Sequence, residues 1–216
     1  MLSRRHLLTL AGVGVLAAGC GPDRRPTLER IRANRTVRVG VANEEPFGYL
    51  DQYGNLAGES PAVARAVLAG LGVDTLEAVQ RPFGHLIDAL LAGTFDIVTA
   101  GMAITPGRCE RVAFSRPDFV APTAFLVLRG NPQRLRTFTD VLRAGVPSAV
   151  LDGSIELEAA RTAGIPDTRI KTYDSPAQLY QAVFQGDTPV GRAVSQPAGA
   201  FAFRPADTDL VDAFNA

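Results

Sequence analysis

Cysteine and histidine are scarce in this sequence, with two of each among its 216 residues. The two cysteines, Cys20 and Cys109, can form at most one disulfide, which excludes a disulfide-rich scaffold. The two histidines, His6 and His85, leave little for a histidine-based metal site or catalytic triad. We therefore expect the protein to bind no metal and no cofactor.

The sequence also lacks net charge, because 22 lysines and arginines balance 22 aspartates and glutamates. Nucleic-acid binding usually requires a clustered basic surface, so we expect no nucleic-acid partner. Hydrophobic residues make up 46% of the chain and charged residues 20%, which is ordinary for a globular protein. The length suits one compact domain or two small lobes.

The first twenty residues have the layout of a signal peptide and contain no acidic residue. The apolar stretch at 7–18 is shorter than the roughly 20 residues that a membrane-spanning helix needs. Arg4 and Arg5 resemble a twin-arginine export signal, although the usual phenylalanine and lysine are missing. Leu16–Cys20 resembles a bacterial lipobox, in which cleavage before the cysteine leaves its thiol to carry a lipid.

We therefore expect a signal peptide over 1–19, lipidation of Cys20 and a polar, lipidated tether over 20–35. The protein would then be an extracytoplasmic lipoprotein held on the membrane by its anchor. The alternative is that this segment is a buried amphipathic helix with an incidental cysteine.

Strands and helices alternate along the rest of the chain, which predicts two lobes of α/β structure with largely parallel sheets. Extended crossovers would join a first lobe at 36–127 and 201–216 to a second lobe at 128–200. The expected strands are 37–41, 76–79, 95–100, 125–128, 148–151, 169–173 and 200–204. The expected helices are 61–71, 83–91, 138–143, 155–163 and 176–184.

Polar and aromatic residues gather where the expected strands end, and open α/β sheets bind ligands at such ends. Arg108 follows one strand and could grip a carboxylate with two hydrogen bonds. Phe47 and Phe83 could stack on a cationic group, and Glu44 could neutralise it. Phe47 and Phe83 could equally be ordinary core aromatics, and Arg108 could be a surface residue paired with an acidic neighbour, Glu110 or Asp118.

The turn before the expected helix at 155–163 is a third candidate. A helix start presents free N–H groups and a positive dipole end, which suits a carboxylate. The same turn at Gly153 and Ser154 could instead be only a turn and an N-cap, which we favour.

Catalysis has little support in the sequence. Cys109 is expected to be a small buried side chain rather than a nucleophile, since only His85 could serve as its base. Asp96 is expected to end a strand or cap a helix. Glu44 is the one obvious general acid or base, and no second group stands out. We therefore expect a binding protein and not an enzyme.

Several segments resemble the periplasmic amino-acid-binding proteins of ABC importers, over a region from about Val37 to Phe214. Within that family, three further segments are most similar to ectoine- and hydroxyectoine-binding proteins. The segments that carry the family resemblance are Phe83–Ile87, Ala92–Asp96, Gly101–Arg108 and Val112–Pro117. Those that carry the ectoine resemblance are Glu44–Tyr49, Leu56–Pro61 and Arg108–Cys109.

The resemblance implies a two-lobed periplasmic-binding-protein type II fold of the α/β class that closes on its ligand. Arg108 would bind the ligand carboxylate, helped by the backbone around Gly101 and Ala103 and by the helix start at Ser154 and Ile155. The remaining site residues would face the cationic part of the ligand: Glu44, Phe47 and Phe83.

The implied function is delivery of ectoine, hydroxyectoine or a related zwitterionic solute to the permease of an ABC importer, by a monomeric protein. Alternatives are a polar amino-acid-binding protein, a cyclic-acid dehydratase-like enzyme on the same fold, and a protein that presents ligand to a membrane sensor.

Two features depart from the family pattern. Ala103 stands where an ectoine-binding protein is expected to carry a third aromatic side chain, which predicts a wider pocket. The second lobe is expected to be incomplete, because Asp187–Arg192 runs almost directly into Gly199–Phe201. The end of the sequence, at 207–216, resembles only the beginning of a terminal helix.

Overall fold

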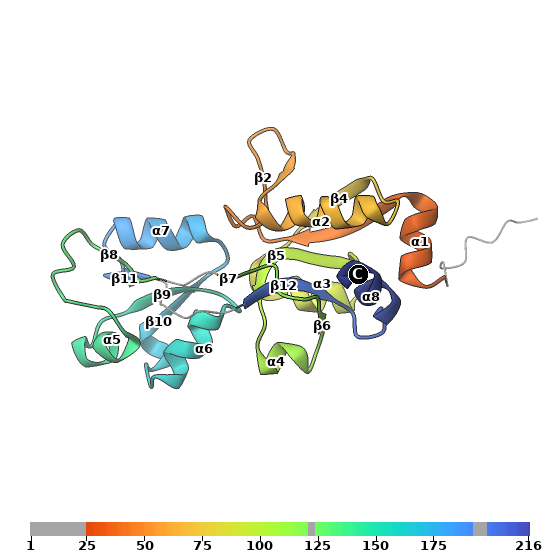
Figure 1. The fold of residues 1–216 in the computed structure, drawn as a ribbon. Coiled ribbons are helices and arrows are strands. Elements are labelled where there is room, and N and C mark those ends of the chain that lie inside the picture. The colour runs from red at the N-terminus through yellow and green to blue at the C-terminus, as the bar shows by residue number, and fades with distance from the viewer. Residues whose placement is uncertain (1–24, 121–123, 192–197) are drawn as a thin grey trace, which may run out of the picture.

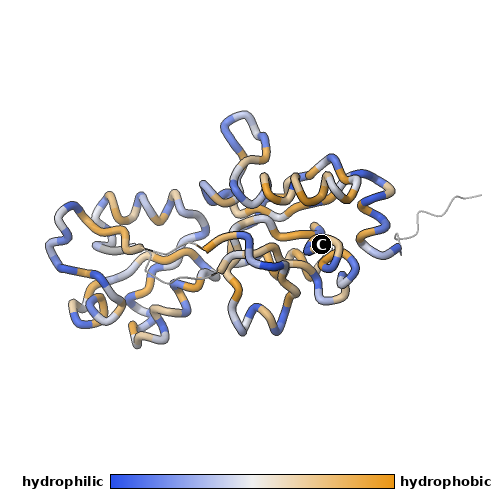
Figure 2. The backbone as a smooth tube through the Cα atoms, in the orientation of Figure 1, coloured by the Kyte–Doolittle hydropathy of each residue, from blue (hydrophilic) through white to orange (hydrophobic). Residues whose placement is uncertain are grey.

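The computed structural model describes residues 25–120, 124–191 and 198–216, which form two α/β lobes lying side by side (Figure 1). The expected signal peptide and Cys20 lie outside the described residues, so lipidation stays a prediction. Within the described ranges, no helix is both long enough and apolar enough to cross a membrane. Hydrophobic residues follow the strands of both lobes, whereas hydrophilic residues gather in the loops (Figure 2).

A six-stranded sheet forms the centre of the first lobe. Its strands are β1 (Thr36–Val41), β4 (Thr75–Gln80), β5 (Ile97–Ala103), β6 (Ala113–Phe114), β7 (Phe119–Val120) and β12 (Ala198–Phe203). The order is β4-β1-β5-β12-β6, and β7 also pairs with β12. β1 runs parallel to β4 and β5, whereas β12 runs antiparallel to β5, so the returning chain completes the sheet.

Helices cover both faces of this sheet. On one face, Ile31, Leu68 and Phe214 pack against the aromatic residues of β12. On the other face, Leu86 and Leu90 pack against Phe95 and Val98. The helices are α1 (Thr27–Asn34), α2 (Glu59–Gly70), the short 3-10 helix η1 (Phe83–His85), α3 (Leu86–Leu91), α4 (Pro106–Cys109) and α8 (Thr208–Asn215), and a hairpin of β2 (Tyr49–Leu50) and β3 (Leu56–Ala57) projects above them.

A four-stranded sheet forms the second lobe. Its strands, in the order they pair, are β10 (Ile170–Tyr173), β9 (Ser148–Leu151), β11 (Val190–Gly191) and β8 (Leu126–Val127). Its helices are α5 (Phe138–Ala144), α6 (Ile155–Thr162), the 3-10 helix η2 (Asp167–Arg169) and α7 (Pro176–Phe184). Hydroxyl side chains begin the helices, since Thr137, Ser154 and Ser175 each accept a hydrogen bond from a backbone N–H of the first turn.

Two expected boundaries were wrong. Residues 126–127 were placed in the first lobe, but β8 pairs with β11 in the second sheet. Residues 198–200 were placed in the second lobe, but β12 already pairs with β5 and β7 from Ala198 onward. The chain therefore passes from one sheet to the other earlier, in both directions, than the hydrophobic pattern indicated.

The expected tether was also wrong in its second half, because residues 27–34 form α1. Ile31 is fully buried in the first lobe, and Arg30 forms an ion pair with Asp96 at 2.6 Å. These two contacts anchor the helix despite its polar composition.

Asp96 binds three arginines that come from distant parts of the chain. Its Oδ1 atom lies 2.6 Å from Arg30, 3.0 Å from Arg38 and 3.3 Å from Arg204, and its side chain is fully buried. Burial alone would raise the pKa of Asp96, but hydrogen bonding from Arg38 and the charges of Arg30 and Arg38 hold that pKa below its usual range. This carboxylate therefore joins α1, β1 and the segment after β12 to the start of β5.

Replacing Asp96 with alanine should lower the free energy of unfolding by about 3 kcal/mol, because three guanidinium groups lose a fully desolvated partner. Urea unfolding at pH 7 measures this change. Asp74→Ala is the control: it removes the exposed partner of Arg35 and should cost less than about 1 kcal/mol. Equal effects of the two substitutions would contradict the role given to Asp96.

Candidate ligand-binding site

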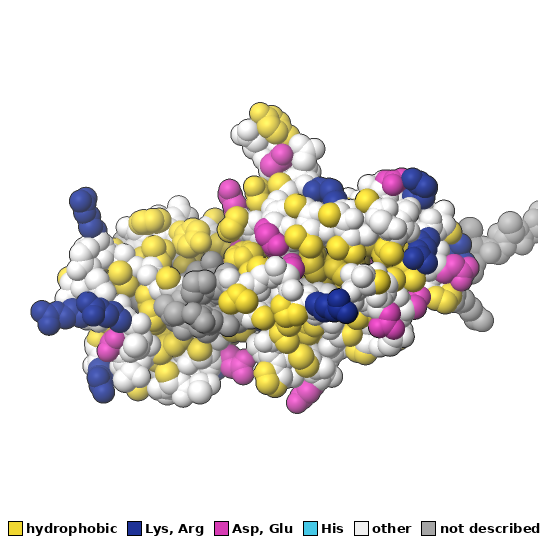
Figure 3. All heavy atoms as spheres, in the orientation of Figure 1, with side chains coloured by type: hydrophobic (Ala, Val, Ile, Leu, Met, Phe, Trp, Pro, Cys, Tyr) yellow, Lys and Arg dark blue, Asp and Glu magenta, His cyan; other side chains and the backbone are white. Residues whose placement is uncertain are grey.

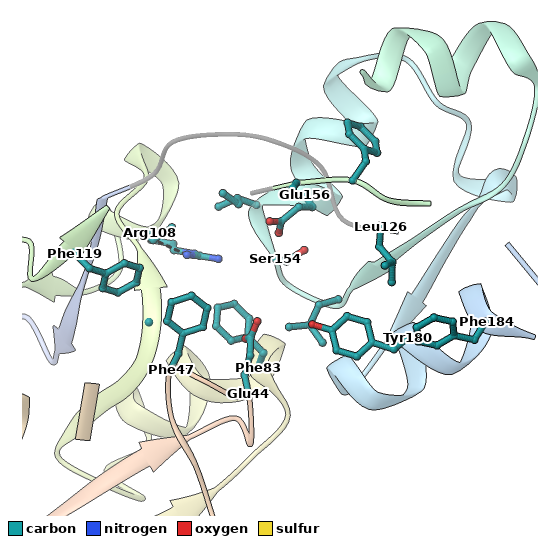
Figure 4. A pocket seen from close by; sticks show the side chains of 16 residues that line it. Glu44, Phe47, Phe83, Arg108, Phe119, Leu126, Ser154, Glu156, Tyr180 and Phe184 are labelled. Carbon is teal, nitrogen blue, oxygen red and sulfur yellow. Dashed lines mark hydrogen bonds between the residues drawn. The ribbon is translucent and has the colours of Figure 1, made fainter. Parts of the chain in front are cut away.

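A cavity of about 510 Å³ lies between the two lobes (Figure 4). All eight side chains or backbone positions predicted to bind ligand line it, although they come from five separate segments of the chain. The first lobe contributes Glu44, Phe47, Phe83, Gly101, Ala103 and Arg108, and the second contributes Ser154 and Ile155. The structure thus brings these residues together, and their contact with a ligand stays a prediction.

Arg108 reaches across the cavity from the first lobe to the second. Thr105 begins α4 and its hydroxyl accepts a hydrogen bond from the Arg108 N–H, which fixes the start of this short helix. The guanidinium donates to the carbonyl of Ala103 at 2.7 Å and to that of Gly153 at 3.0 Å. In the described part of the chain its hydrogen bonds thus go to carbonyls of the cavity wall, not to Glu110 or Asp118.

The environment of Arg108 keeps it buried but charged. Burial lowers the pKa of the guanidinium, while the nearby charges of Glu156 and Glu158 oppose that shift. An arginine side chain stays protonated in proteins even so. Its Cζ atom also lies 5.5 Å from the centre of the Phe83 ring, so one ring face of Phe83 stabilises Arg108 itself.

A tight turn positions Glu44 and Phe47. The N–H groups of Phe47 and Gly48 both donate to the carbonyl of Glu44, at 2.8 and 3.0 Å. A side chain at Gly48 would meet the Thr99 carbonyl at 2.2 Å, so only glycine allows this turn to lie against β5. Glu44 is consequently held at the cavity with 3% of its surface exposed.

The Phe47 ring rests on β5 at Gly101. A Cβ atom at position 101 would come within 2.7 Å of the ring, and the φ angle of +59° there favours glycine as well. Phe47 also stacks against Phe119, with ring centroids 5.1 Å apart and 29° between the planes. Phe119 lines the cavity too, and the sequence analysis missed it. The first lobe therefore contributes three aromatic side chains to this site, Phe47, Phe83 and Phe119, although residue 103 is alanine.

The second-lobe wall contains several residues that the sequence analysis missed. Ser154 caps α6 as favoured, since its hydroxyl accepts from the Leu157 N–H at 3.3 Å. Behind it, Glu156 faces the cavity with 7% of its surface exposed. Tyr180 and Phe184, four residues apart on α7, project into the same space (Figure 4). Their helical spacing was visible in the sequence, but not the lobe that they would face. Ala124, Phe125, Leu126 and Leu151 complete the lining.

One further expectation from the sequence concerns Cys109, which follows Arg108 in the chain. Cys109 was expected to be buried, but it is exposed, because α4 lies on the surface and turns this side chain outward.

Among the described residues, no group of three or more histidine, cysteine, aspartate or glutamate side chains could hold a metal ion. On the face in Figure 3, basic side chains are dispersed over both lobes.

Asp118 lies directly before Phe119, at the exit from the first lobe. Both of its carboxylate oxygens are buried without a hydrogen-bond partner in the described structure. Burial and the nearby charge of Glu59 raise the pKa of Asp118 to about 6. At neutral pH the charge of Asp118 is therefore poorly compensated where it lies, immediately before β7.

Because the folded-state pKa of Asp118 is raised, its favourable contribution is complete below about pH 4 and is lost as the pH rises through about 6. Asp118→Asn removes this dependence. The variant should gain roughly 1–2 kcal/mol of stability over the unsubstituted protein at pH 8, because solvent screens part of the effect at this half-buried residue, and little at pH 4. Urea unfolding of both proteins from pH 4 to 8 measures the difference, and parallel stability curves would show that Asp118 does not titrate as described.

The family follows from comparison with known proteins. The family model for bacterial extracellular solute-binding proteins, family 3, matches residues 37–216. The chain belongs to this family. The predicted α/β periplasmic-binding-protein type II fold is confirmed by its likeness to solved structures of such proteins.

Individual relatives bind amino acids or related solutes, according to their descriptions. A probable amino-acid ABC transporter periplasmic-binding protein of Sinorhizobium fredii is 34% identical over 190 residues, which cover 87% of this chain and 63% of that protein. The ancestral amino acid-binding protein AncCDT-1, a precursor of cyclohexadienyl dehydratase, is 30% identical with a TM-score of 0.81, covering 88% of this chain and 91% of that one. EhuB in complex with hydroxyectoine is 27% identical with a TM-score of 0.82, covering 88% and 84%.

These comparisons establish the family without singling out a ligand. The hydroxyectoine complex and the amino-acid-binding structure resemble the chain to a similar degree, so the special closeness to ectoine-binding proteins is not established. The chain also spans less than two thirds of the length of the first curated relatives that it matches.

Proposed function

We propose that this family 3 protein binds a small amino-acid-like zwitterion between its lobes, outside the cytoplasmic membrane, and delivers it to the permease of an ABC importer. The observation that carries this proposal is the position of Arg108, buried in a cavity between the lobes and in contact with both. The description of the Sinorhizobium relative as an amino-acid ABC transporter component supports the importer assignment.

In this proposal the ligand carboxylate binds Arg108. A guanidinium has five N–H donors, and two of them hold carbonyls of the cavity wall, so donors remain for a carboxylate. The start of α6 at Ser154 and Ile155 lines the opposite side of the cavity, and the first N–H groups of a helix have no partner within the helix. A carboxylate between Arg108 and α6 would thus connect the lobes.

The cationic part of the ligand lies toward Glu44 and the aromatic rings of Phe47 and Phe119. Electron-rich ring faces and a buried carboxylate both favour a cation. This arrangement suits ectoines and amino acids alike, and the proposed activity is binding rather than chemical conversion.

Arg108→Ala should weaken binding of whichever amino acid or ectoine stabilises the protein most in a thermal-shift screen. We expect at least about a 30-fold loss, or 2 kcal/mol, since a desolvated carboxylate loses its partner. Isothermal titration measures the affinity. Arg111→Ala is the matched control, because Arg111 pairs with the exposed Asp88 nearby. Unchanged affinity in Arg108→Ala, or an equal loss in both variants, would refute the assigned role.

The size of residue 103 should decide between ectoine and larger ligands. Ala103→Phe adds an aromatic face to the cavity and should tighten ectoine binding by about threefold to thirtyfold while weakening larger amino acids. Ala103→Leu adds similar bulk without the ring and should not tighten ectoine binding. Titration with ectoine tests this, and unchanged affinity in a folded Ala103→Phe protein would mean that position 103 does not face the ligand.

A further inference from the structure

Glu156 is a buried carboxylate on the second-lobe wall, and the proposed function leaves it without a task. It is the second residue of α6, lines the cavity between the lobes and keeps 7% of its surface exposed. Figure 4 shows its carboxylate and the Arg108 guanidinium turned toward the same space. Glu158, two residues further along α6, carries the same charge but is exposed.

Burying a carboxylate is costly unless a cation or hydrogen-bond donors compensate it. Arg108 is a cation on which Glu156 acts, because the charge of Glu156 opposes the lowering of the Arg108 pKa by burial. When the ligand carboxylate binds Arg108, however, it brings a second negative charge next to Glu156. Two carboxylates that share one guanidinium repel each other, so ligand binding itself leaves Glu156 in need of a cation.

A ligand with a single cationic group, placed at Glu44 and the Phe47 ring on the first lobe, does not remove this repulsion. A ligand with a second cationic group does, because that group can reach the opposite wall. The second-lobe side of the cavity suits such a group, since Tyr180 on α7 adds an aromatic ring to the same cavity as Glu156. The volume of about 510 Å³ leaves room for a long side chain.

We propose that Glu156 determines specificity by receiving a second cationic group of the ligand, so that the site selects basic amino acids over neutral zwitterions. This inference rests on the proposed function, because it requires the ligand carboxylate at Arg108. It adds the substrate class: an amino acid with an ammonium or guanidinium group at the end of its side chain.

Arginine and citrulline provide a matched pair of probes, because they have nearly the same shape and differ in the charge of the terminal group. The full-length protein should bind arginine at least about tenfold more tightly than citrulline in isothermal titration. Glu156→Gln should reduce that preference to about threefold or less by weakening arginine binding. Glu158→Gln removes the same charge from the same helix outside the cavity and should retain the preference.

Each alternative result has a separate meaning. Equal binding of arginine and citrulline by the unsubstituted protein, or an undiminished preference in Glu156→Gln, overturns the inference. An equal loss for both ligands in Glu156→Gln also overturns it, because Glu156 would then contact the α-ammonium group that both share. If citrulline binds well and Arg108→Ala abolishes that binding, the proposed function survives while this inference fails. If neither amino acid binds, both the inference and the assignment to amino acids fail.

Discussion

The guanidinium of Arg108 is held by two carbonyls that belong to different lobes, Ala103 at the end of β5 and Gly153 before α6. The arrangement of the site depends on this one side chain. It ties the carboxyl end of the first sheet to the helix start in the second lobe, and it places a positive charge in a cavity that aromatic, aliphatic and acidic side chains also line. A ligand carboxylate bound in the proposed way would interact with both lobes at once.

The rest of the first lobe serves to present this arginine and the aromatic rings on a rigid base. Gly101 lets the Phe47 ring rest on β5, and Phe119 stacks against the same ring. Far from the cavity, Asp96 holds the start of β5 to three arginines. Close packing thus fixes the first-lobe side of the cavity, buried charge pairs fix the lobe further away, and the buried carboxylate of Asp118 lies just before β7.

Much of the fold could be predicted from the sequence because strands and helices carry local patterns. The helices at 138–144, 155–162 and 176–184 begin within a residue of their expected positions, where Thr137, Ser154 and Ser175 cap them. The helix at 27–34 was missed because its stability comes from Asp96, 66 residues away from Arg30, and a contact of that range leaves no local pattern.

The same distinction explains the site. Glu44, Arg108 and the residues at strand ends were identified because the carboxyl ends of parallel strands share one edge. Glu156 and Tyr180 were missed because each reaches the cavity only through the way the lobes face each other. Phe119 was missed because it reaches the site through a strand pairing with β12, about 80 residues later in the chain. The exposure of Cys109 was missed for a related reason: α4 has only four residues, too few to show which side of it is covered.

The central claim is that a small carboxylate-bearing solute binds between the lobes at Arg108. A crystal structure of the complex with the tightest-binding solute from the thermal-shift screen tests it most directly. The account predicts the ligand carboxylate within hydrogen-bonding distance of the Arg108 guanidinium and of the N–H groups at the start of α6. A ligand bound elsewhere on the protein, or bound in the cavity with its carboxylate turned away from Arg108, would contradict it.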